Sequence, residues 1–301
     1  MWCCTGLRWR AAGPALTWYA VGSEHTGGSG RTRESPLAYG RPLAFAARGT
    51  RRCVGVRRAG RWTPCPGGRE VPARAGRDQC PECARLDRSF SVAADTNAAD
   101  PRPYRVYLAW FGPGLTKVGI TAEERGPARL LEQGAVAHSW LGRGPLMAAR
   151  RTEEVLRAAL GVPDRIPYAH KRAVRAGLPP VAERRAELAE LHARALGLPG
   201  WTETLEPLPC VVADHTEVFG LAGLPRPTRV VAELVDGGTV AGRLVAAAGP
   251  DLHLADGLVV DTRLLCGWVL TAPGEAAAGT SVPVAPVGPD PAAGQEQPGL
   301  F

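Results

Sequence analysis

The stretch that decides the fold of this 301-residue chain is VYLAWFGPGLTKVGIT, residues 106–121. Two apolar runs, VYLAWF and KVGIT, flank a Gly-Pro-Gly turn, and this order is typical of a β-hairpin. Two arginines, Arg125 and Arg129, follow the hairpin closely. A hairpin with a purely structural role does not require them, so the pattern raises the question of a site that handles phosphate.

Charge is distributed unevenly along the chain, although the net charge is only +7. Residues 1–85 carry a net charge of +10, residues 86–175 carry +5 and residues 176–301 carry −8. A basic portion joined to an acidic one is expected of a protein that binds nucleic acid. A solvated basic surface would give the same pattern. Only two of the 36 basic residues are lysines, Lys117 and Lys171.

The sequence predicts neither a membrane span nor a secretion signal. No segment approaches the ~20 apolar residues that cross a bilayer, and the N-terminal residues contain no apolar run of signal-peptide length. We therefore expect no membrane partner and a cytoplasmic location, where thiols stay reduced. The sequence identifies no protein partner.

Four of the eight cysteines, Cys53, Cys65, Cys80 and Cys83, are spaced C-x11-C-x14-C-x2-C. The last two form a CPEC pair, which can hold one tetrahedral Zn²⁺. The first two need a hairpin between them to bring their sulfurs together. We expect a structural zinc, because this segment is too short and polar for a core of its own. Unrelated thiols or a redox-active CxxC pair are the alternatives.

The patterns along the chain predict an α+β protein with six parts. These are an N-terminal β module (1–52), a four-cysteine zinc-binding segment (53–86), a hairpin-and-helix core (100–176), a helical connector (177–227), a C-terminal β module (228–272) and a disordered tail (273–301). Helical periodicity is clearest over 145–160 and 180–198. The flanking β modules are expected to be small and antiparallel.

The pattern VYL…KVGIT…R resembles the GIY-YIG nuclease superfamily, in which two motif strands form a hairpin and a helix follows. The longer pattern VYLA…GLTKVGIT…R…EQGA, preceded by the cysteine pair, resembles a widespread prokaryotic family described as a domain of unknown function. This second resemblance covers residues 40–175. Together they imply a GIY-YIG-like hairpin-and-helix core inside the α+β fold.

The superfamily resemblance implies metal-assisted hydrolysis of a phosphodiester in DNA or RNA. A strand tyrosine helps to activate water, an arginine stabilises the phosphate and a helix glutamate holds one divalent cation, Mg²⁺ or Mn²⁺. The matching catalytic positions are Tyr107, Lys117, Arg129 and Glu153, and the matching phosphate-binding positions are Arg125 and Thr121.

Two positions depart from the superfamily pattern. Arg105 replaces the glycine of the first motif, and Lys117 stands where many members have a second tyrosine. A lysine can hold a phosphate as a point charge, but as an ammonium at neutral pH it is a poor base. The departures leave hydrolysis an open question even if the fold is right.

Each candidate also has a purely structural interpretation. Tyr107 could be an ordinary strand aromatic, the two arginines could be solvated helix-surface cations, and Glu153 could pair with Arg150 or Arg157 at helical spacing. Three functions therefore stay open: a GIY-YIG-type endonuclease, a non-catalytic zinc-containing nucleic-acid-binding protein, and an adaptor with a degenerate nuclease core. We expect nucleic-acid contact through the basic N-terminal half and the hairpin core.

Overall fold

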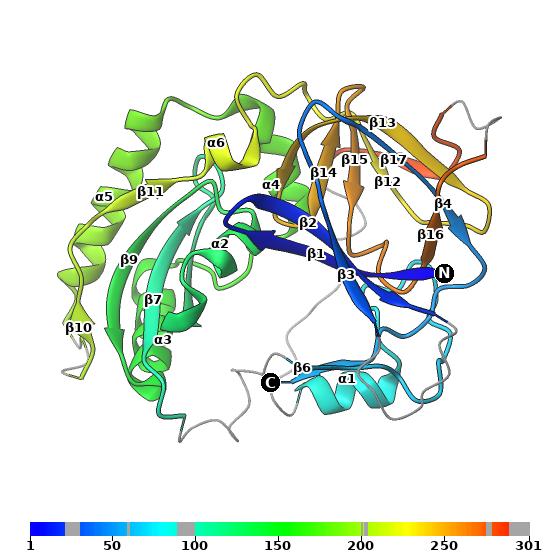
Figure 1. Cartoon of the computed structure of the whole chain (residues 1–301). Helices are drawn as coiled ribbons and strands as arrows, with labels where there is room; N and C mark the ends of the chain where they lie inside the picture. Colours follow the sequence, from blue (N-terminus) through cyan, green and yellow to red (C-terminus); the bar gives the residue numbers. More distant parts are fainter. Residues whose placement is uncertain are drawn as a thin grey trace, which may run out of the picture.

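A computed structural model describes residues 1–21, 31–58, 61–88, 100–199, 201, 204–274 and 279–288. The protein is α+β, and its strands form one large mixed sheet and two smaller sheets (Figure 1). Across these described ranges, none of the helices combines the length and the apolar character needed to cross a membrane.

The large sheet has ten strands among the described residues. From one edge to the other they are β17 (Val284–Pro286), β12 (Arg229–Val231), β15 (Leu258–Asp261), β14 (Asp251–Leu254), β13 (Thr239–Ala248), β4 (Pro42–Arg48), β16 (Val269–Thr271), β1 (Trp2–Arg10), β2 (Gly13–Ala20) and β3 (Thr32–Pro36). β12 and β15 run parallel, and the other described neighbours in the sheet are antiparallel.

β4 joins the two ends of the chain within this sheet. It pairs with β13 on one side and with β16 on the other, and β16 continues to β1. The sequence predicts two small, separate β modules over 1–52 and 228–272. The strand pairing corrects this prediction, because strands of both segments belong to one sheet. Period-two alternation identifies a strand, but it carries no information about which distant strand lies beside it.

Part of the tail predicted to be disordered is a strand. β17 pairs antiparallel with β12, and Val282 just before it is buried in the main core. Backbone hydrogen bonds and this one apolar anchor order a segment whose composition contains little to bury, so the prediction is corrected here. Residues 275–278 and 289–301 of the predicted tail lie outside the described residues.

The quoted hairpin forms the centre of a second sheet. β7 (Tyr104–Trp110) pairs antiparallel with β8 (Thr116–Ala122) on one side and with β9 (Ala137–Gly144) on the other. Two short strands, β10 (Glu206–Pro207) and β11 (Val212–Asp214), pair with β9. They come from the connector predicted to be helical, so this connector contributes to the sheet as well as to the helices.

The Gly-Pro-Gly sequence closes the hairpin as a tight turn. The Leu115 N–H donates to the Gly112 carbonyl at 2.9 Å, which makes Pro113 and Gly114 the two central residues. Gly114 has a φ of +67°, as the third position of a type II turn requires, and proline suits the second. Local sequence alone therefore specifies this turn.

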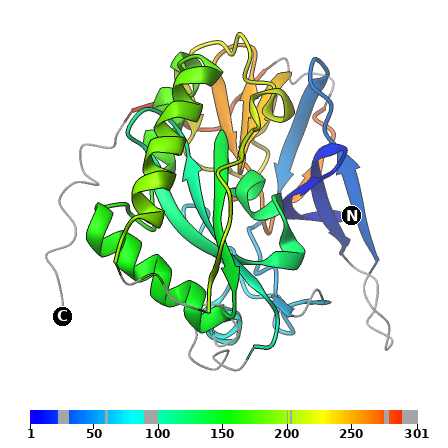
Figure 2. The ribbon, with the colours of Figure 1, turned by 90° about the vertical axis from the view of Figure 1, so that its left-hand side faces the viewer.

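Helices cover both faces of the second sheet. α3 (Leu146–Leu160) and α5 (Val181–Leu196) cover one face (Figure 2), which confirms the helices predicted over 145–160 and 180–198. The short α2 (Ala128–Gln133) lies on the opposite face. The remaining short helices of this region are η2 (Glu123–Arg125), α4 (Tyr168–Val174), η3 (Arg175–Gly177) and α6 (Thr216–Phe219).

Side chains of β7 alternate between two buried environments. Val106, Leu108 and Trp110 belong to the main core, which also contains residues of the large sheet. Tyr107 and Ala109 point the other way and belong to a smaller cluster under α2. Both faces of β7 are therefore buried between Val106 and Trp110, and Tyr107, the predicted site residue of this strand, lies on the face under α2.

A buried ionic cluster links α4 and η3 to the large sheet. Asp251 on β14 is fully buried and accepts hydrogen bonds from Arg172 at 2.7 Å and from Arg175 at 2.5 Å. Burial alone would raise the pKa of Asp251, but the two guanidiniums outweigh it and hold the pKa at about 2. The carboxylate is therefore ionised at neutral pH.

We predict that Asp251→Asn lowers the free energy of unfolding by about 3–5 kcal/mol, because it leaves a buried guanidinium without its anion. Asp256→Asn is the matched control, since its pair with Arg229 is exposed and should cost less than about 1 kcal/mol. Denaturant unfolding measures both values. Equal effects of the two substitutions would contradict the structural role assigned to Asp251.

The low pKa of Asp251 makes the stability of the protein depend on pH. Its pKa is lower in the folded protein than the usual value of about 4 in an unfolded chain. Its contribution to stability is therefore present above pH 4 and is lost as the pH falls from about 4 towards 2. Unfolding curves recorded across that range should show this loss in the wild type and a smaller one in Asp251→Asn.

Candidate functional site

Tyr107 lies at the centre of β7 and packs over the glycine opposite it on β8. A Cβ at Gly119 would lie 2.4 Å from the Tyr107 hydroxyl oxygen, so only glycine fits there. The ring is 2% exposed, and Gln133 Nε2 donates a hydrogen bond to its hydroxyl at 2.9 Å. Burial raises the pKa of the Tyr107 phenol, which therefore stays protonated at neutral pH.

Lys117 lies on the same face of the hairpin as Tyr107. Its side chain is buried, and Nζ donates to the backbone carbonyl of Asp164 at 2.9 Å. Burial, then the charge of Arg129, lower the pKa of Lys117 to about 8, while Glu153 opposes the shift. Because this pKa is still above 7, the amine remains mostly protonated at neutral pH and supplies a buried positive charge.

Arg129 and Glu153 reach this place from two different helices. Arg129 lies on α2 and Glu153 on α3, and each influences the pKa of both Tyr107 and Lys117. Glu153 is half-buried, and burial raises the pKa of its carboxyl group although Lys117 lowers it. These four residues are one electrostatically coupled set, called the Tyr107 group below.

Two residues beside the Tyr107 group, Gln133 and Lys171, were not identified as site residues from the sequence. Gln133 ends α2 and connects Tyr107 to Lys171, whose Nζ donates to the Gln133 carbonyl at 3.1 Å. Lys171 is buried and its Nζ lies 3.8 Å from the centre of the Phe111 ring. Burial, then the charge of Lys117, lower the pKa of Lys171 to about 7. A signal was available: the chain has only two lysines, and both lie here.

Of the two residues predicted to bind phosphate, Thr121 lies on the same face of the hairpin as Tyr107 and Lys117, and Arg125 lies in η2, after the end of β8. Thr121 is buried, and its hydroxyl lies 3.5 Å from the carbonyl of the next residue. Arg125 is exposed and pairs with Glu132 at 2.6 Å. Glu132 also lies 3.8 Å from Arg129, so it connects Arg125 to the Tyr107 group across α2.

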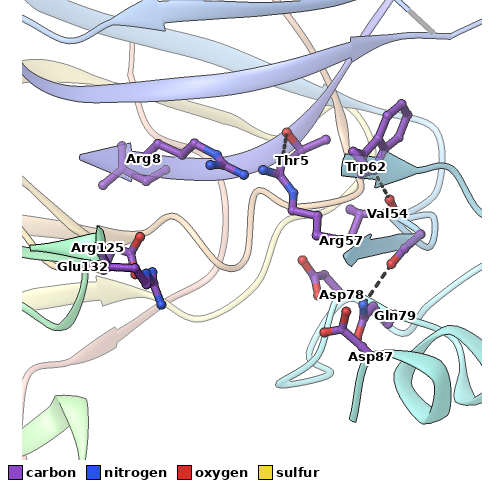
Figure 3. A pocket seen from close by; sticks show the side chains of 12 residues that line it. Thr5, Arg8, Val54, Arg57, Trp62, Asp78, Gln79, Asp87, Arg125 and Glu132 are labelled. Atoms are coloured by element: carbon purple, nitrogen blue, oxygen red, sulfur yellow. Dashed lines mark hydrogen bonds and ion pairs between the residues drawn. The ribbon is translucent and has the colours of Figure 1, made fainter. Parts of the chain in front are cut away.

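A cavity of about 350 Å³ lies beside Arg125, between β1, the cysteine segment and α2 (Figure 3). Three arginines and three carboxylates line it together with Trp62 and Gln79. The arginines are Arg8, Arg57 and Arg125, and the carboxylates are Asp78, Asp87 and Glu132. Arginines from the N-terminal half of the chain and from the hairpin core thus line the same cavity.

Two of these cations have no ion-pair partner among the described residues, namely Arg8 and Arg57. Arg57 donates only to the Thr5 hydroxyl, at 3.3 Å, and burial followed by the charge of Arg10 lowers the pKa of Arg8. Arg125 differs, because Glu132 balances its charge. An anion entering the cavity would meet these two guanidiniums, but also Asp78 and Asp87, whose carboxylates have no ion-pair partner among the described residues either.

The four predicted zinc ligands form one cluster. The sulfurs of Cys53, Cys65, Cys80 and Cys83 all lie within 4.8 Å of one another. Tetrahedral Zn²⁺ with bonds of ~2.3 Å places its sulfurs about 3.8 Å apart, close to the observed 4.0 Å between Cys65 and Cys80. This geometry is consistent with a structural zinc, which would be held by four thiolates.

Local structure brings the two halves of the cluster together. The hairpin of β5 (Val56–Arg58) and β6 (Arg61–Thr63) lies between Cys53 and Cys65, as the sequence required. Cys83 lies in the first turn of α1 (Pro81–Arg88). Backbone N–H groups of Gly55 and Cys80 lie 3.4 Å and 3.2 Å from the Cys53 sulfur, where they would stabilise a thiolate.

The cysteine segment is anchored to the large sheet by one buried guanidinium. Arg51 is 2% exposed and donates to five backbone carbonyls, those of Pro72, Ala73, Ala75, Arg263 and Cys266. By contrast, the hydrophobic cluster inside the segment consists of three cysteines and two valines. Since so little apolar surface is available, metal binding should supply much of the segment's stability.

We predict about one zinc per chain in the purified protein, measured by elemental analysis. Cys80→Ser should lose the metal and destabilise the fold by several kcal/mol, on the order expected for a structural site. Cys210→Ser removes an exposed thiol outside the cluster and should leave both the zinc content and the melting temperature unchanged. A metal-free wild type that is as stable as a zinc-loaded sample would refute the assignment.

Comparison with known proteins identifies the family of this chain. No curated protein and no solved structure matches the chain. The model of one protein family matches residues 40–270, beyond the range 40–175 inferred from the sequence motifs. The matched range contains the four-cysteine cluster and the whole Tyr107 group. The chain belongs to the family described as protein of unknown function (DUF2797).

Proposed function

We propose that this protein binds nucleic acid through its phosphate backbone, at the cavity beside Arg125. The observation that carries this proposal is that Arg8 and Arg57 line the cavity without an ion-pair partner among the described residues. Phosphates repeat along a nucleic-acid strand, so cations contributed by β1, β5 and η2 suit a strand better than a single small anion. The carboxylates in the same cavity would restrict where a phosphate can lie.

The Tyr107 group supports an extension of this surface across α2. Lys117 and Arg129 are cationic, and Glu132 links Arg129 to Arg125 at the cavity. The hairpin followed by α2 has the order expected of a GIY-YIG-like core. The four motif-matched residues come together although they are far apart in the chain, which supports the same interpretation.

Binding of nucleic acid should depend on the salt concentration and on Arg8 and Arg57. We predict that Arg8→Gln and Arg57→Gln each weaken binding to a labelled oligonucleotide by about three- to tenfold and reduce the slope of log K against log salt by about 1. Arg185→Gln is the matched control, because it removes an exposed charge from α5 far along the chain from the cavity-lining segments. Fluorescence anisotropy at several salt concentrations measures these values. Affinities unchanged in both cavity variants would contradict the proposal.

Phosphodiester hydrolysis is a second candidate function, and one observation favours it. Glu153 is a half-buried carboxylate coupled to Tyr107 and Lys117, as a ligand for one divalent cation would have to be. The phenol of Tyr107 is less suitable as a base, because its pKa is raised and Gln133 occupies its hydroxyl. These facts favour binding over cleavage.

Cleavage is tested with labelled DNA and RNA in the presence of Mg²⁺ or Mn²⁺ and with a chelator. If the protein is a nuclease, Glu153→Gln should lower the cleavage rate at least about a hundredfold. Glu154→Gln should not, because Glu154 is exposed and pairs with Arg157 at 2.5 Å. Salt-dependent binding with no cleavage would assign the non-catalytic function. Absence of binding at low salt would leave the adaptor alternative.

A further inference from the structure

A second cavity, of about 220 Å³, has no lining residue in common with the first cavity, the Tyr107 group or the cysteine cluster. It is lined by residues of η3, the start of α5, α6 and the segment after α6. Its polar lining includes Arg175, Arg184 and Thr216, and its apolar lining includes Leu178, Leu221 and Leu224. None of these residues takes part in the proposed nucleic-acid surface.

Arg175 is a buried guanidinium with unused donors. Its side chain is fully buried, and Nη1 donates to Asp251 at 2.5 Å and lies 3.3 Å from His253 Nε2. Nε and Nη2 are also buried but have no hydrogen-bond partner among the described residues. Since a guanidinium has five N–H groups, three of those of Arg175 are left without an acceptor.

Arg184 and Thr216 show the same deficit in the same cavity. Arg184 is 4% exposed, and its Nε lies 2.9 Å from Asp214 Oδ2, an ion pair without hydrogen-bond geometry. Its Nη1 has no partner in the described part of the chain, and neither has the hydroxyl oxygen of Thr216. Three neighbouring side chains from η3, α5 and α6 thus each present a buried polar atom that is not hydrogen-bonded.

Hydrogen-bonding capacity indicates the chemistry that would satisfy these groups. In the ionic cluster that contains Arg175, the carboxylates of Asp251 and Asp261 balance the guanidiniums of Arg172 and Arg175, and the half-exposed Arg263 is open to solvent. The charge of Arg175 is therefore balanced, but three of its N–H groups still lack an acceptor. Guanidiniums are donors only and match the planar oxygens of carboxylate or the oxygens of phosphate. Leu221 and Leu224 are buried, and with Leu178 they suit a small apolar group in the ligand.

We propose that this cavity binds a small organic oxyanion, whose carboxylate or phosphate oxygens accept hydrogen bonds from Arg175, Arg184 and Thr216. The oxyanion supplies acceptors for these donors, and its small apolar portion contacts the leucines. The site is separate from the nucleic-acid surface and does not depend on it. A bound oxyanion would link η3, α5 and α6, since each of these elements supplies one of the three donor groups.

The proposal is tested with the full chain and two probes, inorganic phosphate and acetate, each compared with chloride at equal ionic strength. One or both oxyanions should raise the melting temperature in a saturable manner, and chloride should not. Which of them binds more tightly, measured by titration calorimetry, distinguishes a phosphate ligand from a carboxylate ligand. No saturable stabilisation by either oxyanion, with ordered waters satisfying the three groups in a crystal structure, would overturn the proposal.

Substitutions of lining residues test whether the oxyanion binds in this cavity. Arg184→Gln should weaken oxyanion affinity at least about tenfold, because it removes a charge-assisted donor. Thr216→Val keeps the side-chain shape, so it tests the site even if Arg184→Gln is poorly folded, and it should weaken affinity by about threefold. Arg185→Gln on the same helix should keep wild-type affinity, whereas an oxyanion bound at the first cavity instead would lose affinity in Arg57→Gln. Affinity unchanged in Thr216→Val and lost in Arg57→Gln would place the anion elsewhere and refute the proposal.

Discussion

The alternation of side chains along β7 is the constraint on which the rest of this structure depends. Because β7 is paired on both sides and buried on both faces from Val106 to Trp110, each residue in this stretch belongs either to the main core or to the cluster under α2. A shift of one residue would place Tyr107 in the main core and Leu108 beside Lys117. The packing of Val106, Leu108 and Trp110 therefore fixes the position of the polar face.

The short helix α4 connects that polar face to the large sheet through two adjacent residues. Lys171 donates to the carbonyl of Gln133, which in turn holds the Tyr107 hydroxyl, while Arg172 pairs with Asp251 on β14. Arg175, one turn further, shares Asp251 and lines the second cavity. Three cations within five residues thus connect the second sheet to the large sheet.

Local patterns in the sequence predicted the local parts of this fold, and distant pairing explains the rest. The Gly-Pro-Gly turn, the helices α3 and α5, and the hairpin between Cys53 and Cys65 follow from spacing and residue type within short windows. Pairing of β4 with both β13 and β16 joins segments some 200 residues apart, which no local period can indicate. Gln133 and Lys171 were missed for the same reason, since their partners lie far away in the chain.

The central claim is that nucleic-acid phosphate binds at the cavity beside Arg125 and along a surface that extends across α2 to the Tyr107 group, and the two lysines allow a direct test. Selective ¹⁵N labelling of lysine gives only two side-chain signals, from Lys117 and Lys171. When a short oligonucleotide is added, the Lys117 signal should shift until the site is saturated, and its pKa should rise above about 8, because a nearby phosphate favours the ammonium form. If both signals stay unchanged while the oligonucleotide is bound, the claim is wrong.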